Sequence, residues 1–196
     1  MEVENTDWDK FTELARMEKV VGIGECGLDY SRLEGLELSQ KEKEIDRQRR
    51  LFAKQLGIAT ILGLPLSIHI RDAYTDLIEI IRNSQKPLAA VFHCFSGTQE
   101  YLDFLMTGPH NFYFSFAGNI TFKKADNLRD LARQIPLEKL MIETDCPFLT
   151  PEPLRGSRNE PANVIITAQK LAEVKDVSVE KIIEITTQNT ERLFKI

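Results

Sequence analysis

Cysteine is scarce in this sequence, and its spacing gives no metal-binding pattern. The three cysteines are Cys26, Cys94 and Cys146, and no two of them have the Cys-x-x-Cys spacing. This spacing argues against a zinc ribbon and against a disulfide framework. We therefore expect small buried thiols in a reducing compartment.

Long apolar runs and a surplus of basic residues are also absent. No apolar run approaches the roughly 20 residues that a membrane helix needs, and the N-terminal stretch MEVENTDWDK is too acidic and polar for a signal peptide. The formal net charge of −5 argues against a broadly basic nucleic-acid-binding face, although it allows a local basic rim. We expect a cytoplasmic protein with no membrane partner, and a single domain over residues 1–196.

Short apolar runs that end on a polar residue are the main feature that is present. Four of them close on Glu25, His69, His93 and Asp145. In the last run Glu143 and Asp145 fall on the same face, because side chains alternate along a strand. Two carboxylates there are costly to bury unless a cation or hydrogen-bond donors satisfy them. The four runs predict strands that deliver ligands to one point.

Helical patterns alternate with the apolar runs, which predicts a parallel sheet covered on both sides, an α/β fold. Strands are expected at 20–25, 65–69, 88–93, 112–116 and 140–145. Helix-start signals are Thr6, the capping box from Ser39 to Glu42, Asp72, Thr98, Ala125, Pro161 and Ser178, with a separate final helical stretch that closes at Phe194.

The histidines and carboxylates form a candidate metal site. A single histidine at the end of a strand more often packs or makes a turn hydrogen bond than binds a metal. However, the sequence has only three histidines, and two of them, His69 and His93, end strands. Together with Glu25 and Asp145 they make a set of nitrogen and oxygen ligands that suits Mg²⁺, Mn²⁺ or Zn²⁺. At the C-terminal strand ends of an α/β barrel such a site can activate water for hydrolysis.

Other polar residues lie near the same strand ends. Arg71 shares the face of His69, and Arg158 and Asn159 follow Asp145 in a long loop, so all three are candidate contacts for a phosphate. Solvent exposure is the alternative for the arginines. Glu143 lies deeper and is better interpreted as a buried carboxylate that orients its neighbours. Lys123 and Lys124 are consistent with a solvated helix start.

Five ordered blocks resemble one family, the TatD-type metal-dependent deoxyribonucleases. The blocks are GECGLDY, PLSIHIRDA, VFHCFSG, ETDCPFL and RGSRNEP, and TTQNTERLF resembles the family's C-terminal helix. The resemblance implies a (β/α)₈, TIM-type metal-dependent hydrolase barrel that cleaves DNA phosphodiesters, often as a 3′ exonuclease. It implies that Glu25 bridges two divalent ions, that His69 and His93 complete one site, and that Asp145 serves the other and helps to orient or deprotonate water.

The sequence departs from this family pattern at one important point. Family members begin with a strand that carries a His-x-His pair, and this sequence contains no such pair. The resemblance therefore implies a barrel that lacks about the first three strands. The sheet edges would then be covered by a missing N-terminal segment or by a partner chain.

The predicted function is metal-dependent hydrolysis of DNA, with single strands or 3′ ends as substrate, and activity of this shortened chain is in doubt. Two alternatives remain open. One is hydrolysis of another ester or of a C–N bond on the same scaffold. The other is a non-catalytic half-barrel that binds partners through its open edges.

Overall fold

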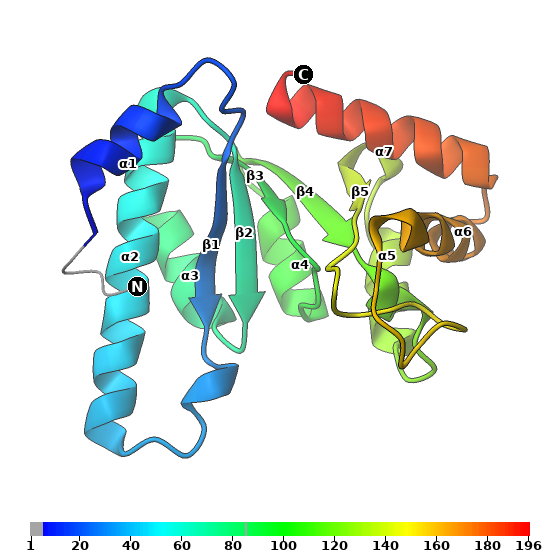
Figure 1. Ribbon diagram of the computed structural model, residues 1–196, viewed down its shortest axis with the longest axis horizontal. Coiled ribbons are helices and arrows are strands. Elements are labelled where there is room, and N and C mark those ends of the chain that lie inside the picture. The colour runs from blue at the N-terminus through cyan, green and yellow to red at the C-terminus, as the bar shows by residue number, and fades with distance from the viewer. Residues whose placement is uncertain (1–5, 85) are drawn as a thin grey trace. The chain divides into compact units, whose positions relative to one another are not determined.

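The computed structural model describes residues 6–84 and 86–196. It has an α/β fold, and the strand order in the sheet follows the chain, β1-β2-β3-β4-β5 (Figure 1). The pairs β1–β2 and β4–β5 are parallel, as the alternation of strands and helices predicts. The strands are β1 Ile23–Asp29, β2 Leu66–Arg71, β3 Ala89–Phe92, β4 Asn111–Phe116 and β5 Leu140–Ile142.

The chain divides into two compact units, and the boundary passes through β3. Unit 1 comprises residues 1–90 and 109–111, and unit 2 comprises residues 91–108 and 112–196. The prediction of a single domain over residues 1–196 stays a prediction, as does that of a barrel that lacks its first strands.

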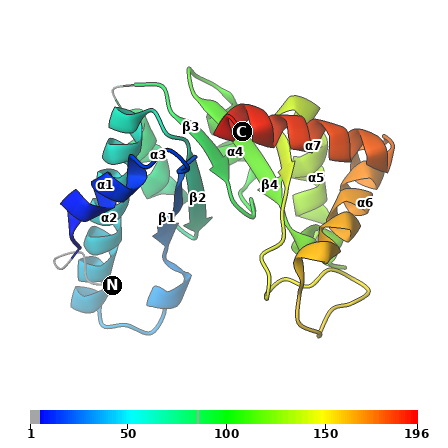
Figure 2. The ribbon, with the colours of Figure 1, turned by 45° about the horizontal axis from the view of Figure 1, so that its top comes forward.

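Unit 1 is built on the β1–β2 pair. The long helix α2 packs against β1, and α3 packs against β2 (Figure 2). The register places Gly27 opposite His69, and it is interrupted between Ile23 and Cys26. The helices of this unit are α1 Trp8–Ala15, the short 3₁₀ helix η2 Ser31–Leu33, α2 Leu38–Leu62 and α3 Tyr74–Arg82.

Unit 2 has an aromatic core beside β4. Phe92 stacks on Phe114 with ring centroids 5.7 Å apart, and Phe95 meets the edge of Phe114 at 4.9 Å. The alternating aromatics of the predicted strand thus form the core of this unit. Helix α7 packs against β5, and α6 packs against α5 and α7. The helices are α4 Gln99–Met106, η3 Gly118–Thr121, α5 Asp126–Gln134, η4 Leu137–Lys139, η5 Pro161–Asn163, α6 Val164–Lys175 and α7 Val179–Phe194.

Several helix boundaries differ from those predicted. Asp7, not Thr6, caps α1, and its carboxylate accepts from the backbone N–H of Lys10 at 2.9 Å. The capping box of α2 joins Glu37 to Gln40, and the N-cap lies two residues before the predicted Ser39 start. An acidic side chain caps both helices in place of the predicted hydroxyl residue, and sequence alone does not fix a helix end to within one or two residues.

The C-terminal region also differs from the prediction. Val179–Phe194 is one continuous helix, whereas the sequence predicts two stretches. Elsewhere, none of the helices in the described residues has both the length and the apolar character required to cross a bilayer.

Candidate metal centre

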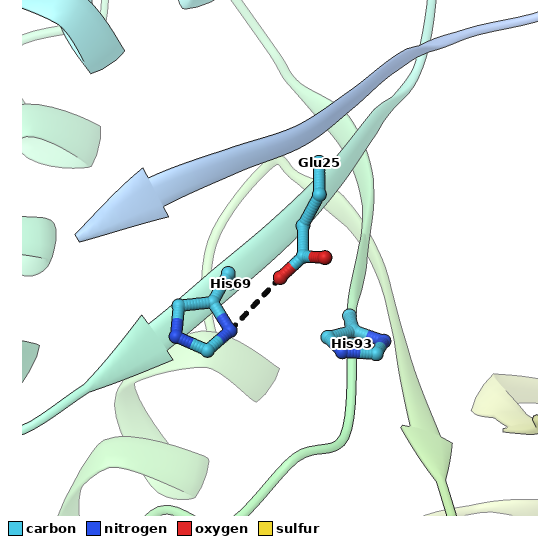
Figure 3. Close-up of side chains that lie close together, drawn as sticks. All are labelled: Glu25, His69 and His93. Atoms are coloured by element: carbon cyan, nitrogen blue, oxygen red, sulfur yellow. Dashed lines mark ion pairs between the residues drawn. The ribbon is translucent and has the colours of Figure 1, made fainter. Parts of the chain in front are cut away.

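Glu25 and His69 meet in unit 1, on neighbouring strands. Glu25 Oε1 lies 2.9 Å from His69 Nδ1, and the two side chains are about half and one-third exposed (Figure 3). Parallel pairing of β1 with β2 brings these residues together, as the strand-end pattern predicts. However, β1 continues to Asp29, so Glu25 lies within the strand and not at its end.

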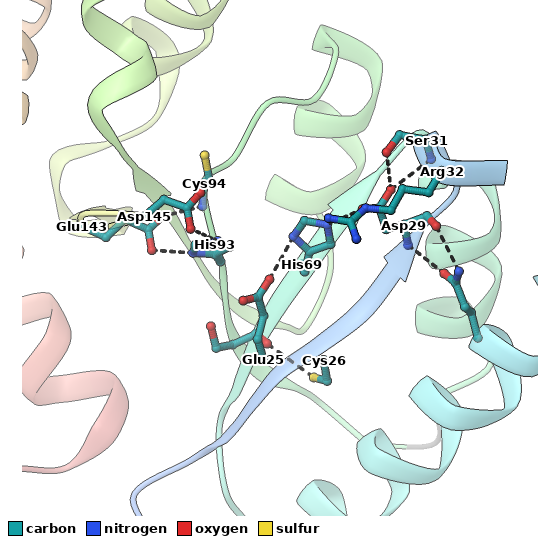
Figure 4. Close-up of polar contacts among 12 residues, drawn as sticks. Glu25, Cys26, Asp29, Ser31, Arg32, His69, His93, Cys94, Glu143 and Asp145 are labelled. Atoms are coloured by element: carbon teal, nitrogen blue, oxygen red, sulfur yellow. Dashed lines mark hydrogen bonds and ion pairs between the residues drawn. The ribbon is translucent and has the colours of Figure 1, made fainter. Parts of the chain in front are cut away.

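Asp29 is a further carboxylate at this place that the sequence reasoning missed. Its Oδ2 atom lies 3.5 Å from His69 Nε2, and its Oδ1 atom accepts from both the backbone N–H and the hydroxyl of Ser31, at 3.0 and 2.6 Å (Figure 4). Partial burial raises the pKa of Asp29, but the hydrogen bonds from Ser31 and the nearby His69 outweigh it, so the net pKa is lowered. Asp29 belongs to the GECGLDY block, and its place in that block is the sequence feature that could have identified it as a candidate ligand.

Gly27 allows the two strands that carry these ligands to approach closely. It has a φ of +141°, and a Cβ atom there would lie 1.8 Å from the carbonyl oxygen of His69. A side chain at this position must therefore push β1 away from β2 or change the backbone conformation.

Gly27→Ala is expected to lower the free energy of unfolding by about 2–4 kcal/mol, because it combines a backbone clash with an unfavourable φ. Gly57→Ala is the matched control. Gly57 lies in α2, and a Cβ atom there would have no neighbour within 4 Å, so alanine should be neutral or stabilising by up to about 1 kcal/mol. Urea unfolding of both variants measures the difference, and equal stability would contradict the proposed close approach.

His93 and two carboxylates meet in unit 2, after β3 and β5. Glu143 Oε2 lies 2.6 Å from His93 Nδ1, and Glu143 Oε1 accepts from the backbone N–H of Cys94 at 2.5 Å (Figure 4). A carboxylate only accepts, so Nδ1 carries a proton, and in the neutral imidazole Nε2 then has the lone pair that can bind a ligand. Asp145 Oδ1 lies 3.7 Å from Nε2. Glu143 thus makes the hydrogen bonds to neighbouring groups that an orienting carboxylate needs, although its side chain is 22% exposed and not fully buried.

The last strand is shorter than predicted, which changes how its polar residues are held. β5 ends at Ile142, so Glu143 and Asp145 lie in the segment that follows it and not on the strand. The backbone N–H of Glu143 still donates to Phe116 of β4 at 3.1 Å, which keeps this residue at the end of the sheet.

The three predicted phosphate contacts differ in their surroundings. Arg71, at the end of β2, and Arg158, in the loop after β5, are exposed. Asn159 is buried: its amide donates to the carbonyl of Phe148 at 2.7 Å, and its oxygen accepts from the backbone N–H of Glu160 at 2.9 Å. These bonds favour a role for Asn159 in fixing the loop, whereas substrate contact by all three residues stays a prediction.

In each unit, the imidazole and carboxylate groups that meet have the chemistry of a site for a hard or borderline divalent metal ion. Each unit contributes one imidazole and at least two carboxylates, and none of these groups is a thiolate. Carboxylate oxygen and imidazole nitrogen suit Mg²⁺, Mn²⁺ and Zn²⁺. The fixed Nδ1–H of His93 is the outer contact that metal-binding histidines usually have.

The cysteines next to the candidate ligands differ in accessibility. Cys26 is buried, and burial, followed by the charge of Glu25, raises its thiol pKa to about 12. Cys146 is exposed. At pH 8 we expect iodoacetamide to alkylate Cys146 in the folded protein and Cys26 only after unfolding, because the thiolate is the reactive form. Mass spectrometry of the alkylated peptides checks this, and early alkylation of Cys26 would show that β1 opens readily.

Comparisons with known proteins, by sequence and by structure, point to the same family. A sequence profile described as TatD related DNase matches residues 1–195. The chain is 42% identical over 197 residues to a Bacillus subtilis protein named as the uncharacterized metal-dependent hydrolase YabD, covering 100% of this chain and 72% of that protein. It is 34% identical to an Escherichia coli protein named 3′-5′ ssDNA/RNA exonuclease TatD, covering 98% of this chain and 75% of that protein.

A solved structure has a fold similar to that of this chain. The crystal structure of YjjV, a TatD homologue from Escherichia coli, superposes with a TM-score of 0.81 at 27% identity, over 96% of this chain and 69% of that chain.

Proposed function

The chain belongs to the TatD related DNase family of metal-dependent hydrolases, and we propose from this premise that it cleaves phosphodiester bonds of DNA. The observation that carries the proposal is the pairing of an imidazole with a carboxylate in each unit: His69 with Glu25, and His93 with Glu143. A phosphodiester is an anion, and the exposed arginines Arg71 and Arg158 suit an anionic substrate.

Two divalent ions are the proposed cofactors. Glu25, His69 and His93 would hold one ion, and Glu25 and Asp145 would serve the second. When bound, such ions lower the pKa of water and neutralise charge on the phosphate. The sequence contains no His-x-His pair, so the second ion has fewer candidate ligands than the first.

The chain's own residues have separate roles in this proposal. Glu143 holds the imidazole of His93 by its Nδ1–H and thereby fixes the direction of Nε2. The carboxylate of Asp145 accepts a proton from the attacking water and orients it. Arg71 and Arg158 neutralise the phosphate oxygens, and Asn159 keeps the loop that carries Arg158 in place.

The proposed substrate is single-stranded DNA, attacked at its 3′ end. A relative that is 34% identical is named as a 3′-5′ exonuclease on single-stranded DNA and RNA. We further propose that the five strands belong to a TIM-type barrel that lacks about its first three strands. A partner chain or an N-terminal segment would then cover the sheet edges.

Digestion of a 5′-labelled single-stranded oligonucleotide tests the proposal. With Mg²⁺ or Mn²⁺ we expect products that shorten one nucleotide at a time from the 3′ end, and excess EDTA should abolish them. Small carboxylic esters and amides tested in parallel should not be hydrolysed. Turnover of an ester or amide without cleavage of DNA would replace the nuclease proposal with another metal-dependent hydrolysis.

A further inference from the structure

A cavity in unit 2 is lined in part by Ser96, which follows the candidate ligand His93 by three residues, and it has no role in the proposed function. It has a volume of about 700 Å³ and opens between η3, the start of α5 and the loop after β5. We call it the Lys–Arg cavity, after its cationic residues Lys123, Lys124 and Arg155. Its other polar lining residues are Ser96, Asn119, Asn127 and Glu152.

The charge of the Lys–Arg cavity is opposite to that of the whole chain. Three cations face one carboxylate, Glu152, although the chain has a net charge of −5. Within the described residues, neither Lys123 nor Lys124 has an ion-pair partner, whereas the neighbouring Asp126 pairs with Arg129 at 2.7 Å. A concentration of unpaired cations in an acidic protein favours an anionic ligand.

One wall of the Lys–Arg cavity is a flat stacking surface. The guanidinium carbon of Arg155 lies 3.8 Å from the centroid of the Phe122 ring, so this cation makes a cation–π contact with the ring. Nucleobases stack on aromatic rings and on guanidinium planes alike. A simple inorganic anion would use the charges of this cavity but not the stacking surface.

The loop that carries Arg155 is held firmly on η3. A Cβ atom on Gly118 would lie 2.2 Å from the carbonyl oxygen of Leu149, so the loop touches the backbone of η3. The backbone N–H of Glu152 donates to Thr121 Oγ1 at 2.8 Å. The stacking surface is therefore built into unit 2.

The Lys–Arg cavity is also connected to the ligand His93. Asn119 Nδ2 donates to the thiol of Cys94 at 3.4 Å, and the backbone N–H of Cys94 donates to the carboxylate that holds His93. Asn119 Oδ1 is buried, and in the described part of the chain it has no hydrogen-bond partner. Asn119 thus links the wall of the cavity to the residues that position His93.

We propose that the Lys–Arg cavity binds the single strand of nucleic acid next to the bond that is cut. Lys123 and Lys124 each bind a backbone phosphate, and an unstacked base lies against the Arg155–Phe122 surface. This inference rests on the proposed nuclease function, because it names a substrate contact for the same site. The sequence pattern had suggested only a solvated helix start for the two lysines.

Binding of a fluorescent oligothymidylate in EDTA tests the inference without cleavage. Lys123→Gln with Lys124→Gln should weaken binding about 10-fold and make the slope of log K against log salt about 1.4 less steep, since each single-strand phosphate contact contributes about 0.7. Phe122→Leu should weaken binding about 10-fold with an unchanged slope, because it removes stacking and no charge.

A matched double variant controls for charge. Lys170→Gln with Lys181→Gln removes the same charge from exposed helix positions of unit 2, where each lysine pairs with a glutamate. This control should bind the oligothymidylate like the unmodified protein. An equal loss in the control and in the Lys123, Lys124 variant would overturn the inference.

Measurements of turnover distinguish a failure of the cavity assignment from a failure of the proposed nuclease function. In the Lys123, Lys124 variant KM for the oligonucleotide should rise about 10-fold, and hydrolysis of a small chromogenic phosphodiester should be unchanged. Unchanged oligonucleotide binding with unchanged KM would refute the cavity assignment and leave the nuclease proposal intact. Binding that depends on the two lysines, in a protein that cleaves no phosphodiester, would refute the nuclease proposal alone.

Discussion

Replacing His69 and His93 together with alanine is expected to weaken Mn²⁺ binding by at least about 100-fold and to abolish metal-dependent DNA hydrolysis. Loss of a contact that only orients a metal ligand typically costs about 10–100-fold in affinity, and here two proposed ligands are removed. Both imidazoles are partly exposed, with side-chain exposures of 32% and 14%, so the substitutions should be tolerated by the fold. Isothermal titration with Mn²⁺ measures the affinity.

His110→Gln is the matched control for this variant, because His110 is the third histidine of the sequence. Its Nδ1 atom accepts from the backbone N–H of Leu88 at 3.1 Å, and glutamine retains a side-chain acceptor. Partial burial lowers the pKa of His110. We expect unchanged Mn²⁺ affinity in this control. Undiminished affinity in the His69, His93 variant would remove both histidines from the metal site.

Asp145→Asn is expected to reduce kcat for DNA hydrolysis by about 10²–10⁴-fold, because the amide cannot accept a proton from water and this is the usual contribution of a general base. KM should change much less, since the proposed role of Asp145 lies in the chemical step. The structure places its Oδ1 atom 3.7 Å from His93 Nε2, beside the proposed metal-binding nitrogen. Steady-state kinetics on a labelled oligonucleotide measures both constants.

The control for the Asp145 variant is Asp130→Asn, an exposed aspartate of α5 that pairs with Arg133 at 2.6 Å. It should leave kcat unchanged. If Asp145→Asn retained full kcat, Asp145 would have to be removed from the chemical step, although it could still contribute to metal binding.

The sequence predicted the parallel strands and the meeting of several polar side chains for a clear physical reason. Parallel strands end at the same edge of a sheet, so polar residues after apolar runs are expected there. Glu25 with His69 in unit 1, and His93 with Asp145 in unit 2, confirm that this pattern places the members of each pair close together. The alternation rule also identified Glu143 as a carboxylate with an orienting role.

Features that depend on register and on tertiary contacts were not predictable in this way. Asp29 reaches His69 because β1 has an irregular register and continues four residues past Glu25, and neither property has a periodic signal. Asn159 was predicted as a substrate contact, and only the fold shows that its amide is used inside the loop. The cavity joins Lys123 and Lys124 to Arg155, which is about 30 positions away in the chain.

The proposal on which the account depends is that Glu25, His69 and His93 would bind one divalent ion. Anomalous diffraction from a crystal of the protein grown with Mn²⁺ tests it most directly. The account predicts an anomalous peak at about 2.0–2.3 Å from Glu25 Oε and from a ring nitrogen of each histidine. A well-occupied Mn²⁺ peak elsewhere, with these three side chains free of metal, would contradict it.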